Sequence, residues 1–188
     1  MGASTTNALF YLVSTLFEVY MWILMLRIIL QVVRADFYNP ISQLVVQLTQ
    51  PIVKPLQKVL PKYRQWDLAG IALLVVISII YVHAIGALVP GYGERYTGLA
   101  SLVPAFWKLV TMTLNLYTFA LVIQAILSWV GPGVNNPAGS ILWSLNEPLL
   151  RPVRRVIPPF SGLDLSPLVV IVLLQTVNLL MPVPGIFR

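Results

Sequence analysis

Two stretches of this sequence match each other in pattern and register. Residues 50–61 read QPIVKPLQKVLP, and residues 147–158, 97 positions later, read EPLLRPVRRVIP. Three prolines keep their places in both copies: Pro51, Pro55 and Pro61 in the first, and Pro148, Pro152 and Pro158 in the second. Each stretch is basic and lies between two long apolar blocks. So many prolines in fixed register predict a loop of defined shape that occurs twice.

The match extends outward from these stretches at the same offset and without a gap. Asn39-Pro40 aligns with Asn136-Pro137, Tyr20 with Tyr117, and Asp67 with Asp164. A gapless match over about fifty residues is hard to obtain by chance. The sequence therefore predicts two copies of one unit, residues 1–96 and 97–188.

Composition places both units in a membrane. The chain is 58% hydrophobic and 10% charged, with a mean hydropathy of +0.85, whereas about a quarter of the residues of a soluble domain are charged. The apolar residues form four blocks, at about 7–33, 69–89, 102–130 and 167–183, near the length of about 20 residues that a span needs. We expect an all-α membrane protein with four transmembrane helices, arranged as two helical hairpins of parallel orientation.

The placement of Lys and Arg predicts the orientation. The connection after the first span holds Arg34, Lys54, Lys58, Lys62 and Arg64, and the connection after the third holds Arg151, Arg154 and Arg155. The connection between the two units holds Arg95 alone. By the positive-inside rule both basic loops are cytoplasmic and both termini periplasmic. Both units then face the same way, so their pseudo-symmetry axis runs along the membrane normal.

The residue inventory argues against several classes of function. The absence of cysteine excludes disulfides and thiolate metal sites. The sequence offers no Ser/His/Asp constellation, carboxylate pair, P-loop or dinucleotide motif, so we expect neither an enzyme nor a cofactor. The basic residues lie beside apolar segments and not on a soluble face, which argues against nucleic acid.

Each basic loop predicts a short helix with a capped start. Asn39 and Asn136 are N-caps, and Pro40 and Pro137 occupy the first helical position. We expect an amphipathic helix in the membrane interface that ends at Pro51 or Pro148, followed by a kinked piece at Pro55 or Pro152, with Pro61 and Pro158 completing the loop. The kinked pieces carry Lys54, Lys58, Arg151, Arg154 and Arg155. These cations predict docking to lipid headgroups or a partner, or an interfacial anchor that follows the positive-inside rule.

Polar residues inside the spans form a stripe in each unit. Tyr20, Leu24, Arg27 and Gln31 share one helical face, and their counterparts are Tyr117, Leu121, Gln124 and Ser128. We expect the two stripes to face each other, with Gln124 as a partner for Arg27. Snorkelling of Arg27 toward the cytoplasmic surface is the alternative.

Four further residues are candidates for structural or functional roles. Glu18, whose counterpart is Asn115, lies on the face opposite Arg27; it is either a proton, cation or partner site, or a protonated side chain that hydrogen-bonds a neighbouring helix. Asp67 and Asp164 precede the second and fourth spans and are expected to stabilise helix starts. His83 is interpreted as an interfacial polar residue and not as a ligand.

Four motifs carry a resemblance to a known family: DFYNP at 36–40, TQPIVKPL at 49–56, EPLLRPVRRVIP at 147–158 and LDLSP at 163–167. With them the chain resembles the YggT family, and specifically its proteobacterial members with two tandem copies, over nearly its whole length. The first copy departs from the pattern, since Ala69-Gly70 stands where the second has Ser166-Pro167.

The resemblance implies an inner-membrane protein of accessory character. Bacterial members are linked to osmotic-shock tolerance and potassium supply, and others lie among division genes. Plastid relatives are implicated in haem attachment to a cytochrome b subunit and in nucleoid distribution. The family offers no agreed catalytic residues to carry over.

Three hypotheses of function follow. The leading one is a non-enzymatic inner-membrane accessory or assembly protein whose cytoplasmic loops dock on the lipid bilayer, its anionic headgroups and an unknown membrane-protein partner, with a link to osmotic-stress tolerance. The alternative is a small ion transporter or channel component related to potassium or osmolytes, built as a homo-oligomer with Glu18, Arg27 and Gln124 on its path. A haem-handling role, resting on His83, is third.

Overall fold

The protein is all-helical in the computed structural model, which describes residues 3–61, 63–89, 91–92, 94–130, 136–157 and 164–187. These residues form six α-helices and two short 3₁₀ helices, with an isolated bridge between Tyr63 and Trp66. The elements in chain order are α1 (Ala3–Val32), α2 (Pro40–Gln57), α3 (Leu68–Leu88), η1 (Gly98–Ser101), α4 (Leu102–Val130), α5 (Pro137–Val156), α6 (Ser166–Leu180) and η2 (Gly185–Phe187).

Three of the helices are long and apolar enough to cross a membrane: residues 5–32 of α1, all of α3, and residues 98–127 over η1 and α4. The fourth predicted span is shorter than expected, because α6 ends at Leu180 and not near residue 183. Its 15 residues measure about 22 Å, against about 30 Å of hydrocarbon. Pro182 and Pro184 follow at once, and proline cannot continue a helix.

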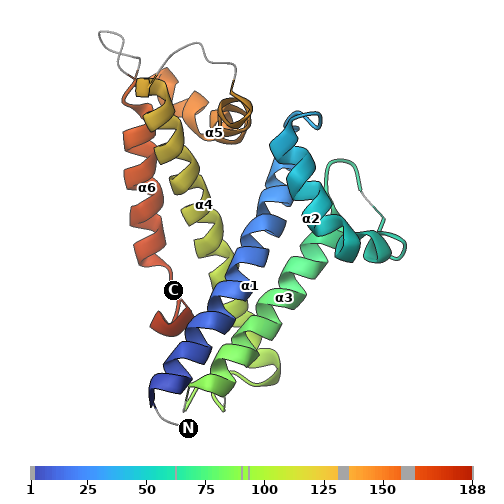
Figure 1. Cartoon of the computed structure of the whole chain (residues 1–188). Coiled ribbons are helices and arrows are strands. Elements are labelled where there is room, and N and C mark those ends of the chain that lie inside the picture. Colours follow the sequence, from blue (N-terminus) through green and yellow to red (C-terminus); the bar gives the residue numbers. More distant parts are fainter. Residues whose placement is uncertain are drawn as a thin grey trace.

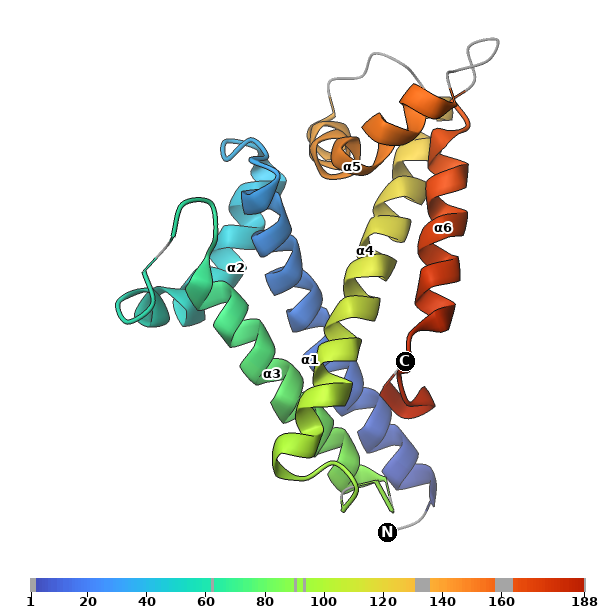
Figure 2. The same cartoon turned by 180° about the vertical axis from the view of Figure 1, so that it is seen from behind.

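The helices are arranged as two similar groups. α1 packs along α3, and α4 packs along α6, each pair being joined through its amphipathic helix α2 or α5. Both amphipathic helices lie at the same end of the molecule, opposite the N-terminus (Figure 1). Seen from behind, α1 and α4 diverge toward that end (Figure 2). The two groups therefore point the same way along the long axis of the molecule.

The amphipathic helices run through their internal prolines, so the expectation that Pro51 and Pro148 end them is wrong. α2 contains Pro51 and Pro55, and α5 contains Pro148 and Pro152. All four prolines are exposed, on the side opposite the buried faces of their helices. Proline has no N–H, so the carbonyl four residues before each of these prolines loses its helical donor. Solvent or lipid headgroups can donate to these carbonyls instead, and each helix bends without ending. The ribbon of α5 changes direction along its course (Figure 2).

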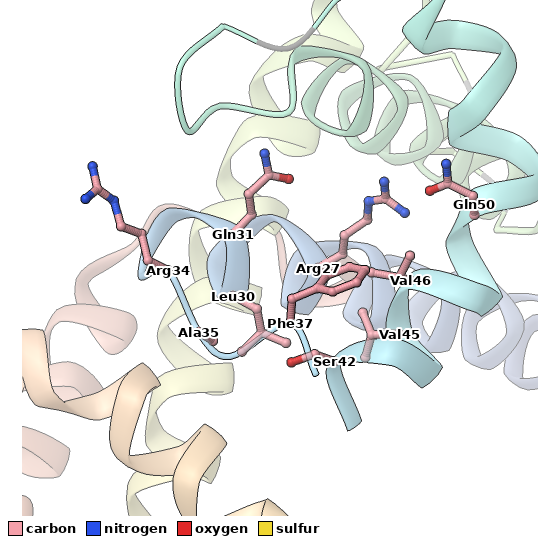
Figure 3. A pocket seen from close by; sticks show the side chains of 10 residues that line it. All are labelled: Arg27, Leu30, Gln31, Arg34, Ala35, Phe37, Ser42, Val45, Val46 and Gln50. Atoms are coloured by element: carbon pink, nitrogen blue, oxygen red, sulfur yellow. The ribbon is translucent and has the colours of Figure 1, made fainter. Parts of the chain in front are cut away.

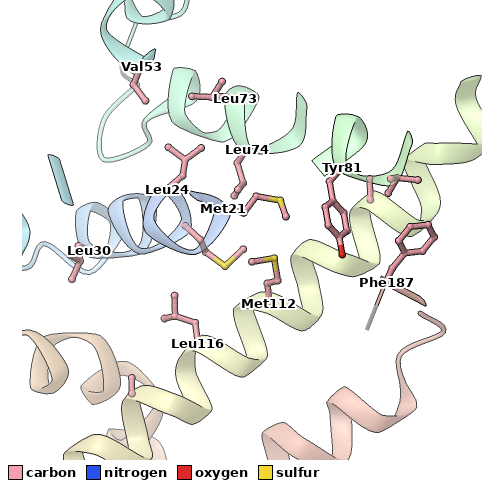
Figure 4. Close-up of a cluster of buried hydrophobic side chains, with 14 of the residues drawn as sticks. Met21, Leu24, Leu30, Val53, Leu73, Leu74, Tyr81, Met112, Leu116 and Phe187 are labelled. Carbon is pink, nitrogen blue, oxygen red and sulfur yellow. The ribbon is translucent and has the colours of Figure 1, made fainter. Parts of the chain in front are cut away.

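A large hydrophobic cluster joins the two groups of helices and includes residues of α2 and α5. Met21, Leu24 and Met25 of α1 pack with Leu73, Leu74 and Tyr81 of α3 and with Met112 and Leu116 of α4 (Figure 4). A smaller cluster of Leu121, Leu150 and Val170 joins α4, α5 and α6. The larger core thus spans both units, since Ile141 and Leu145 of α5 also belong to it, while the smaller core lies within the second unit.

The C-terminal segment returns to the first unit. Phe187 in η2 is fully buried, and its ring centroid lies 5.6 Å from that of Tyr96 and 6.3 Å from that of Tyr81. Tyr92 completes this aromatic group, 6.5 Å from Phe187. The end of the second unit is therefore anchored on the connection between α3 and α4.

Candidate functional site

A buried ion pair organises the half of the first unit that lies next to α2. Arg27 Nε of α1 donates to Asp67 Oδ2 at 3.1 Å, and Arg27 Nη1 donates to Thr49 Oγ1 of α2 at 2.7 Å. Gln57 Nε2 at the end of α2 donates to the other oxygen, Asp67 Oδ1, at 3.1 Å. The side chains of Arg27 and Asp67 are 5% and 0% exposed. These contacts tie α1, α2 and the start of α3 together.

The second unit repeats this network with the arginine moved to another position. Counterparts lie 97 residues on: Gln124 replaces Arg27, Asn146 replaces Thr49, and Arg154 replaces Gln57, while Asp164 corresponds to Asp67. Asn146 Nδ2 donates to Gln124 Oε1 at 2.6 Å, and Arg154 Nε donates to Asp164 Oδ2 at 2.8 Å. Each unit therefore holds one Arg–Asp pair, supplied by α1 in the first and by α5 in the second.

The predicted pairing of Arg27 with Gln124 is wrong. Both side chains turn into their own units, where Arg27 meets Asp67 and Gln124 meets Asn146. Leu121 likewise packs with Leu150 and Val170 inside the second unit. Arg27 does not snorkel, since its side chain is buried. The side chain of Ser128, the last member of the predicted stripe, lies outside the described residues.

Asp67 stabilises a helix start as predicted, and Asp164 does so in a related way. Asp67 is the N-cap of α3 and accepts the Gly70 N–H at 3.2 Å. Asp164 stands one residue before the cap of α6 and accepts the Ser166 N–H at 2.9 Å. A Cβ on Gly70 would come within 3.2 Å of the Asp67 carboxyl group. The first unit's departure to Ala69-Gly70 thus leaves room, and an N–H donor, for Asp67.

Asp164 is more exposed than Asp67, and its pKa is lowered by its hydrogen-bond partners. Burial raises the pKa of Asp164, but hydrogen bonds from Ser166 and Arg154 outweigh burial and leave that pKa below its ordinary value. Arg154 Nη1 also donates to Glu147 Oε2 at 2.8 Å, so two carboxylates hold one guanidinium. Arg154 therefore differs from the other predicted docking cations, because its charge is matched within the protein.

Glu18 joins the two units through an ion pair. Lys108 Nζ of α4 donates to Glu18 Oε1 at 2.6 Å, and Tyr81 Oη of α3 donates to the same oxygen at 3.0 Å. The side chain of Lys108 is 5% exposed and that of Glu18 is 34% exposed. The contact of Glu18 with Tyr81 has a counterpart in the second unit, where Asn178 Nδ2 donates to Asn115 Oδ1 at 2.7 Å. Glu18 is thus a contact between helices of both units, which its spacing within α1 alone does not reveal.

The caps of the amphipathic helices also connect the units. Asn39 Oδ1 accepts the Ile41 N–H and Asn136 Oδ1 accepts the Ala138 N–H, which confirms both N-caps, and Pro40 and Pro137 are the first helical residues. Asn39 Nδ2 in addition donates to the Pro137 carbonyl at 2.8 Å and to Ser140 Oγ at 2.9 Å. Among the remaining loop residues, Pro61 follows the end of α2, and Pro158 lies outside the described residues.

Four of the five predicted docking cations are exposed at the end of the molecule that α2 and α5 form. Lys54, Lys58, Arg151 and Arg155 are exposed, and none of them enters an ion pair among the described residues. They come from α2 and α5, which contact each other.

Two cavities adjoin the C-terminal end of α1. The first, of about 450 Å³, lies between α1 and α2, where Arg27, Gln31, Arg34 and Gln50 supply polar groups and Leu30, Val45 and Phe37 supply apolar ones (Figure 3). The second, of about 490 Å³, is lined by Arg34, Arg64, Gln65 and Trp66. Arg34 belongs to both.

His83 belongs to no cluster of possible metal ligands in the part of the chain that the structure describes. No group of three His, Asp or Glu side chains gathers there. His83 Nδ1 lies 2.8 Å from the Ile79 carbonyl oxygen one turn earlier, and its side chain is exposed. The ring is engaged with its own helix.

Sequence reasoning missed five partners of the predicted charges: Thr49, Gln57, Tyr81, Lys108 and Glu147. Thr49 stands on the buried face of α2, where its hydroxyl also donates to the Val45 carbonyl. The repeat itself held a signal for Gln57, since Arg and Gln change places between positions 27/57 and 124/154. A reciprocal exchange of this kind indicates that either position can supply the cation for the carboxylate at 67 or 164.

Known proteins resemble the chain over most of its length. An uncharacterized protein of Pseudomonas aeruginosa is 39% identical over 174 residues, covering 93% of this chain and 88% of the relative. The uncharacterized protein YggT of Escherichia coli K12 is 36% identical over 178 residues, covering 92% of this chain and 88% of the relative. YlmG homolog protein 2 of Arabidopsis thaliana, a chloroplast protein, is 38% identical over 65 residues, which is 33% of this chain and 24% of the relative.

No solved structure matches the chain significantly. The family model CCB3/YggT matches it twice, over residues 6–88 and 103–184, one match within each predicted unit. With both matches and the proteobacterial relatives, the chain belongs to the CCB3/YggT family as a tandem repeat.

Proposed function

We propose that this protein is a non-enzymatic accessory or assembly protein of the bacterial inner membrane. In this proposal α1, α3, α4 and α6 are the four spans, the termini are periplasmic, and α2 and α5 form a cytoplasmic platform for a membrane-protein partner. Bacterial relatives and three long apolar helices support the setting, and the basic residues at the α2/α5 end support the orientation.

The observation that carries the proposal is the joined pair of basic amphipathic helices. Bonds from Asn39 to Pro137 and Ser140 hold the N-terminal ends of α2 and α5 together. The same two helices expose Lys54, Lys58, Arg151 and Arg155. Because the two helices are already held together in the free protein, an acidic partner surface beside anionic headgroups can bind these cations without ordering the helices first.

The charges inside the membrane-spanning part favour this proposal over ion transport. Arg27 is matched by Asp67, and Lys108 is matched by Glu18. Paired charges of this kind hold helices together, whereas a transport path needs groups that change partners. Transport keeps one observation in its favour: the Glu18 side chain is 34% exposed. If Glu18 carries protons or cations, Glu18→Gln abolishes ion flux in proteoliposomes; under our proposal no Glu18-dependent flux exists.

Site-specific crosslinking tests the platform. Photoreactive residues at Lys58 and Arg155 in the full chain in cells should capture one and the same membrane protein, identified by mass spectrometry. Leu99 serves as the control position, because it is highly exposed and lies in η1, away from the α2/α5 end. Capture of lipid alone at both platform positions, or of equal amounts of the same protein at Leu99, would contradict the proposal.

A growth measurement tests the link to osmotic stress separately. If the platform acts in osmotic tolerance, cells that carry Lys58→Glu and Arg155→Glu at normal protein levels should grow more slowly after a salt upshift. Growth equal to that of the parent strain would remove osmotic tolerance from the proposal.

A further inference from the structure

Two arginines adopt backbone conformations that normally belong to glycine. Among the described residues, Arg34 and Arg64 are the non-glycine residues with positive φ, at 56° and 54°. Side chains with a Cβ enter this left-handed region at an energetic cost. Both exceptions are arginine, and both line the same 490 Å³ cavity. We therefore look for the reason in their side chains.

The local structure shows why glycine would suit both positions. Arg34 follows the end of α1, where the Ala35 N–H bonds the Leu30 carbonyl at 2.9 Å and the Arg34 N–H bonds the Gln31 carbonyl at 3.2 Å. Many helices end with this pair of backbone hydrogen bonds, and glycine usually occupies the position that Arg34 has here. The aligned residue of the second unit is Gly131. Arginine at position 34 therefore serves something other than ending the helix.

Arg64 lies in a tight turn with the same preference. Tyr63 and Trp66 exchange backbone hydrogen bonds of 3.1 Å and 2.9 Å, which leaves Arg64 and Gln65 as a two-residue loop. The first central residue of such a loop needs positive φ and is usually Gly, Asn or Asp. The turn places the Arg64 side chain on the cavity that Arg34 also lines.

The cationic cavity has no acidic partner in the described part of the chain. No ion pair involves Arg34 or Arg64 there. Asp36 uses Oδ1 to accept the Tyr38 N–H at 2.9 Å, and Asp67 is occupied by Arg27, Gln57 and Gly70. An anion between two guanidinium groups at one cavity relieves their repulsion, and phosphate fits the guanidinium fork through two parallel hydrogen bonds.

The adjoining 450 Å³ cavity offers an apolar wall beside its polar groups. In Figure 3 the polar ends of Arg27, Gln31, Arg34 and Gln50 lie toward one side, and Leu30 and Val45 lie toward the other. The buried Ser42 hydroxyl on this cavity has no hydrogen-bond partner. Exposed Trp66 stands at the cationic cavity, and tryptophan prefers the level of lipid headgroups.

We propose that these two cavities form a specific site for an anionic phospholipid. Arg34 and Arg64 bind its phosphate, Trp66 lies beside the headgroup, and the wall of Leu30, Val45 and Phe37 receives the start of an acyl chain. At the positions of Arg34 and Arg64 the sequence of the second unit has Gly131 and Ser161, which carry no charge. The proposal is independent of partner docking, which uses the exposed cations farther along α2 and α5.

Lipid titration of the full chain in detergent tests the site. Phosphatidylglycerol and phosphatidylcholine of equal chain length are added stepwise, and native mass spectrometry counts bound lipid. The parent chain should bind one phosphatidylglycerol saturably, and phosphatidylcholine much more weakly. Arg34→Gly and Arg64→Gly should each weaken phosphatidylglycerol binding by about tenfold, the loss expected for a charge-assisted contact to phosphate.

The control variant separates a specific site from general attraction. Arg155→Gln removes one exposed, unpaired cation from the same end of the molecule and should leave binding within about twofold, because Arg155 lines neither cavity. Arg34→Gly relieves backbone strain, so its thermal stability should equal or exceed that of the parent chain; Arg34→Asn, which also tolerates this conformation, provides a second test. Equal losses in Arg34→Gly and Arg155→Gln would overturn the proposal. Displacement of the lipid by an equal concentration of inorganic phosphate would overturn it too, in favour of a soluble anion.

Discussion

The exchange of Arg and Gln between the two units leads to the sharpest prediction. Arg27→Gln removes the cation from the buried pair with Asp67, and Gln57→Arg then supplies one from the position where the second unit holds Arg154. The doubly substituted first unit thereby adopts the residue pattern of the second: glutamine in the span and arginine at the end of the amphipathic helix.

The structure sets the size of the effect. The Asp67 side chain is 0% exposed, so solvent screens its charge little. Without Arg27 the carboxylate retains two neutral donors, Gln57 Nε2 and the Gly70 N–H. Removing one partner of a buried ion pair costs about 3–5 kcal/mol, and we expect Arg27→Gln to lower the unfolding free energy by that amount. Adding Gln57→Arg should recover about half of the loss or more, a coupling typical of residues in one network.

Denaturant unfolding of the full chain in detergent, followed by tryptophan fluorescence, measures these differences. The four chains of a double-mutant cycle give the coupling energy between positions 27 and 57. The mirror exchange in the second unit, Gln124→Arg with Arg154→Gln, is the matched control and should show a rescue of the same sign but smaller, because Arg154 and Asp164 are part-exposed. If the double variant is no more stable than Arg27→Gln alone, the two networks are not equivalent and the reasoning fails.

Three further predictions concern the remaining polar contacts. Glu18→Gln leaves the buried Lys108 ammonium with a neutral acceptor; we expect a loss of about 1–3 kcal/mol, less than for a fully buried pair because Glu18 is part-exposed, and Lys108→Met should reverse it. A double variant as unstable as Glu18→Gln would count against the pair. The pKa of Asp164 is lowered in the folded chain despite its burial, through bonds from Ser166 and Arg154; its stabilisation is complete above about pH 4 and is lost as the pH falls through the lowered pKa. Asp164→Asn should therefore flatten the melting temperature against pH on the acid side, and an unchanged slope would refute the assignment. Asn39→Ala removes a cap and both bonds to the second unit and should cost about 1–2 kcal/mol, more than Asn136→Ala, which removes a cap; equal losses in thermal unfolding would show that the bonds between the units contribute nothing.

The prolines show what a local rule predicts and what it misses. Proline at the first helical position and asparagine before it were sufficient to predict where α2 and α5 begin. The same rule placed their ends at Pro51 and Pro148, where both helices in fact continue. Each internal proline lies on the exposed face of its helix, so the carbonyl that loses its donor remains within reach of water or headgroups. Exposure depends on which face the tertiary structure covers.

The pairing of charges illustrates a second limit. Helical periodicity assigned Arg27 and Gln124 to corresponding faces of their helices, and this correspondence is real. Periodicity gives no direction toward a neighbour, so it could not tell that each face turns into its own unit, toward Asp67 and Asn146. The partners of Glu18 are 63 and 90 residues away along the chain, at Tyr81 and Lys108. No local pattern reaches across that separation.

The sequence by itself determined the membrane setting, the family, the duplication, the caps and the approximate spans, because hydropathy, proline register and capping act within a few residues of the chain. The tertiary structure decided which charges meet, that α2 and α5 join at their starts, and that Arg34 and Arg64 share a cavity. These features depend on helix packing, which brings together groups that the chain keeps far apart. In a low-dielectric interior an unpaired charge is too costly to remain, so packing and pairing are selected together.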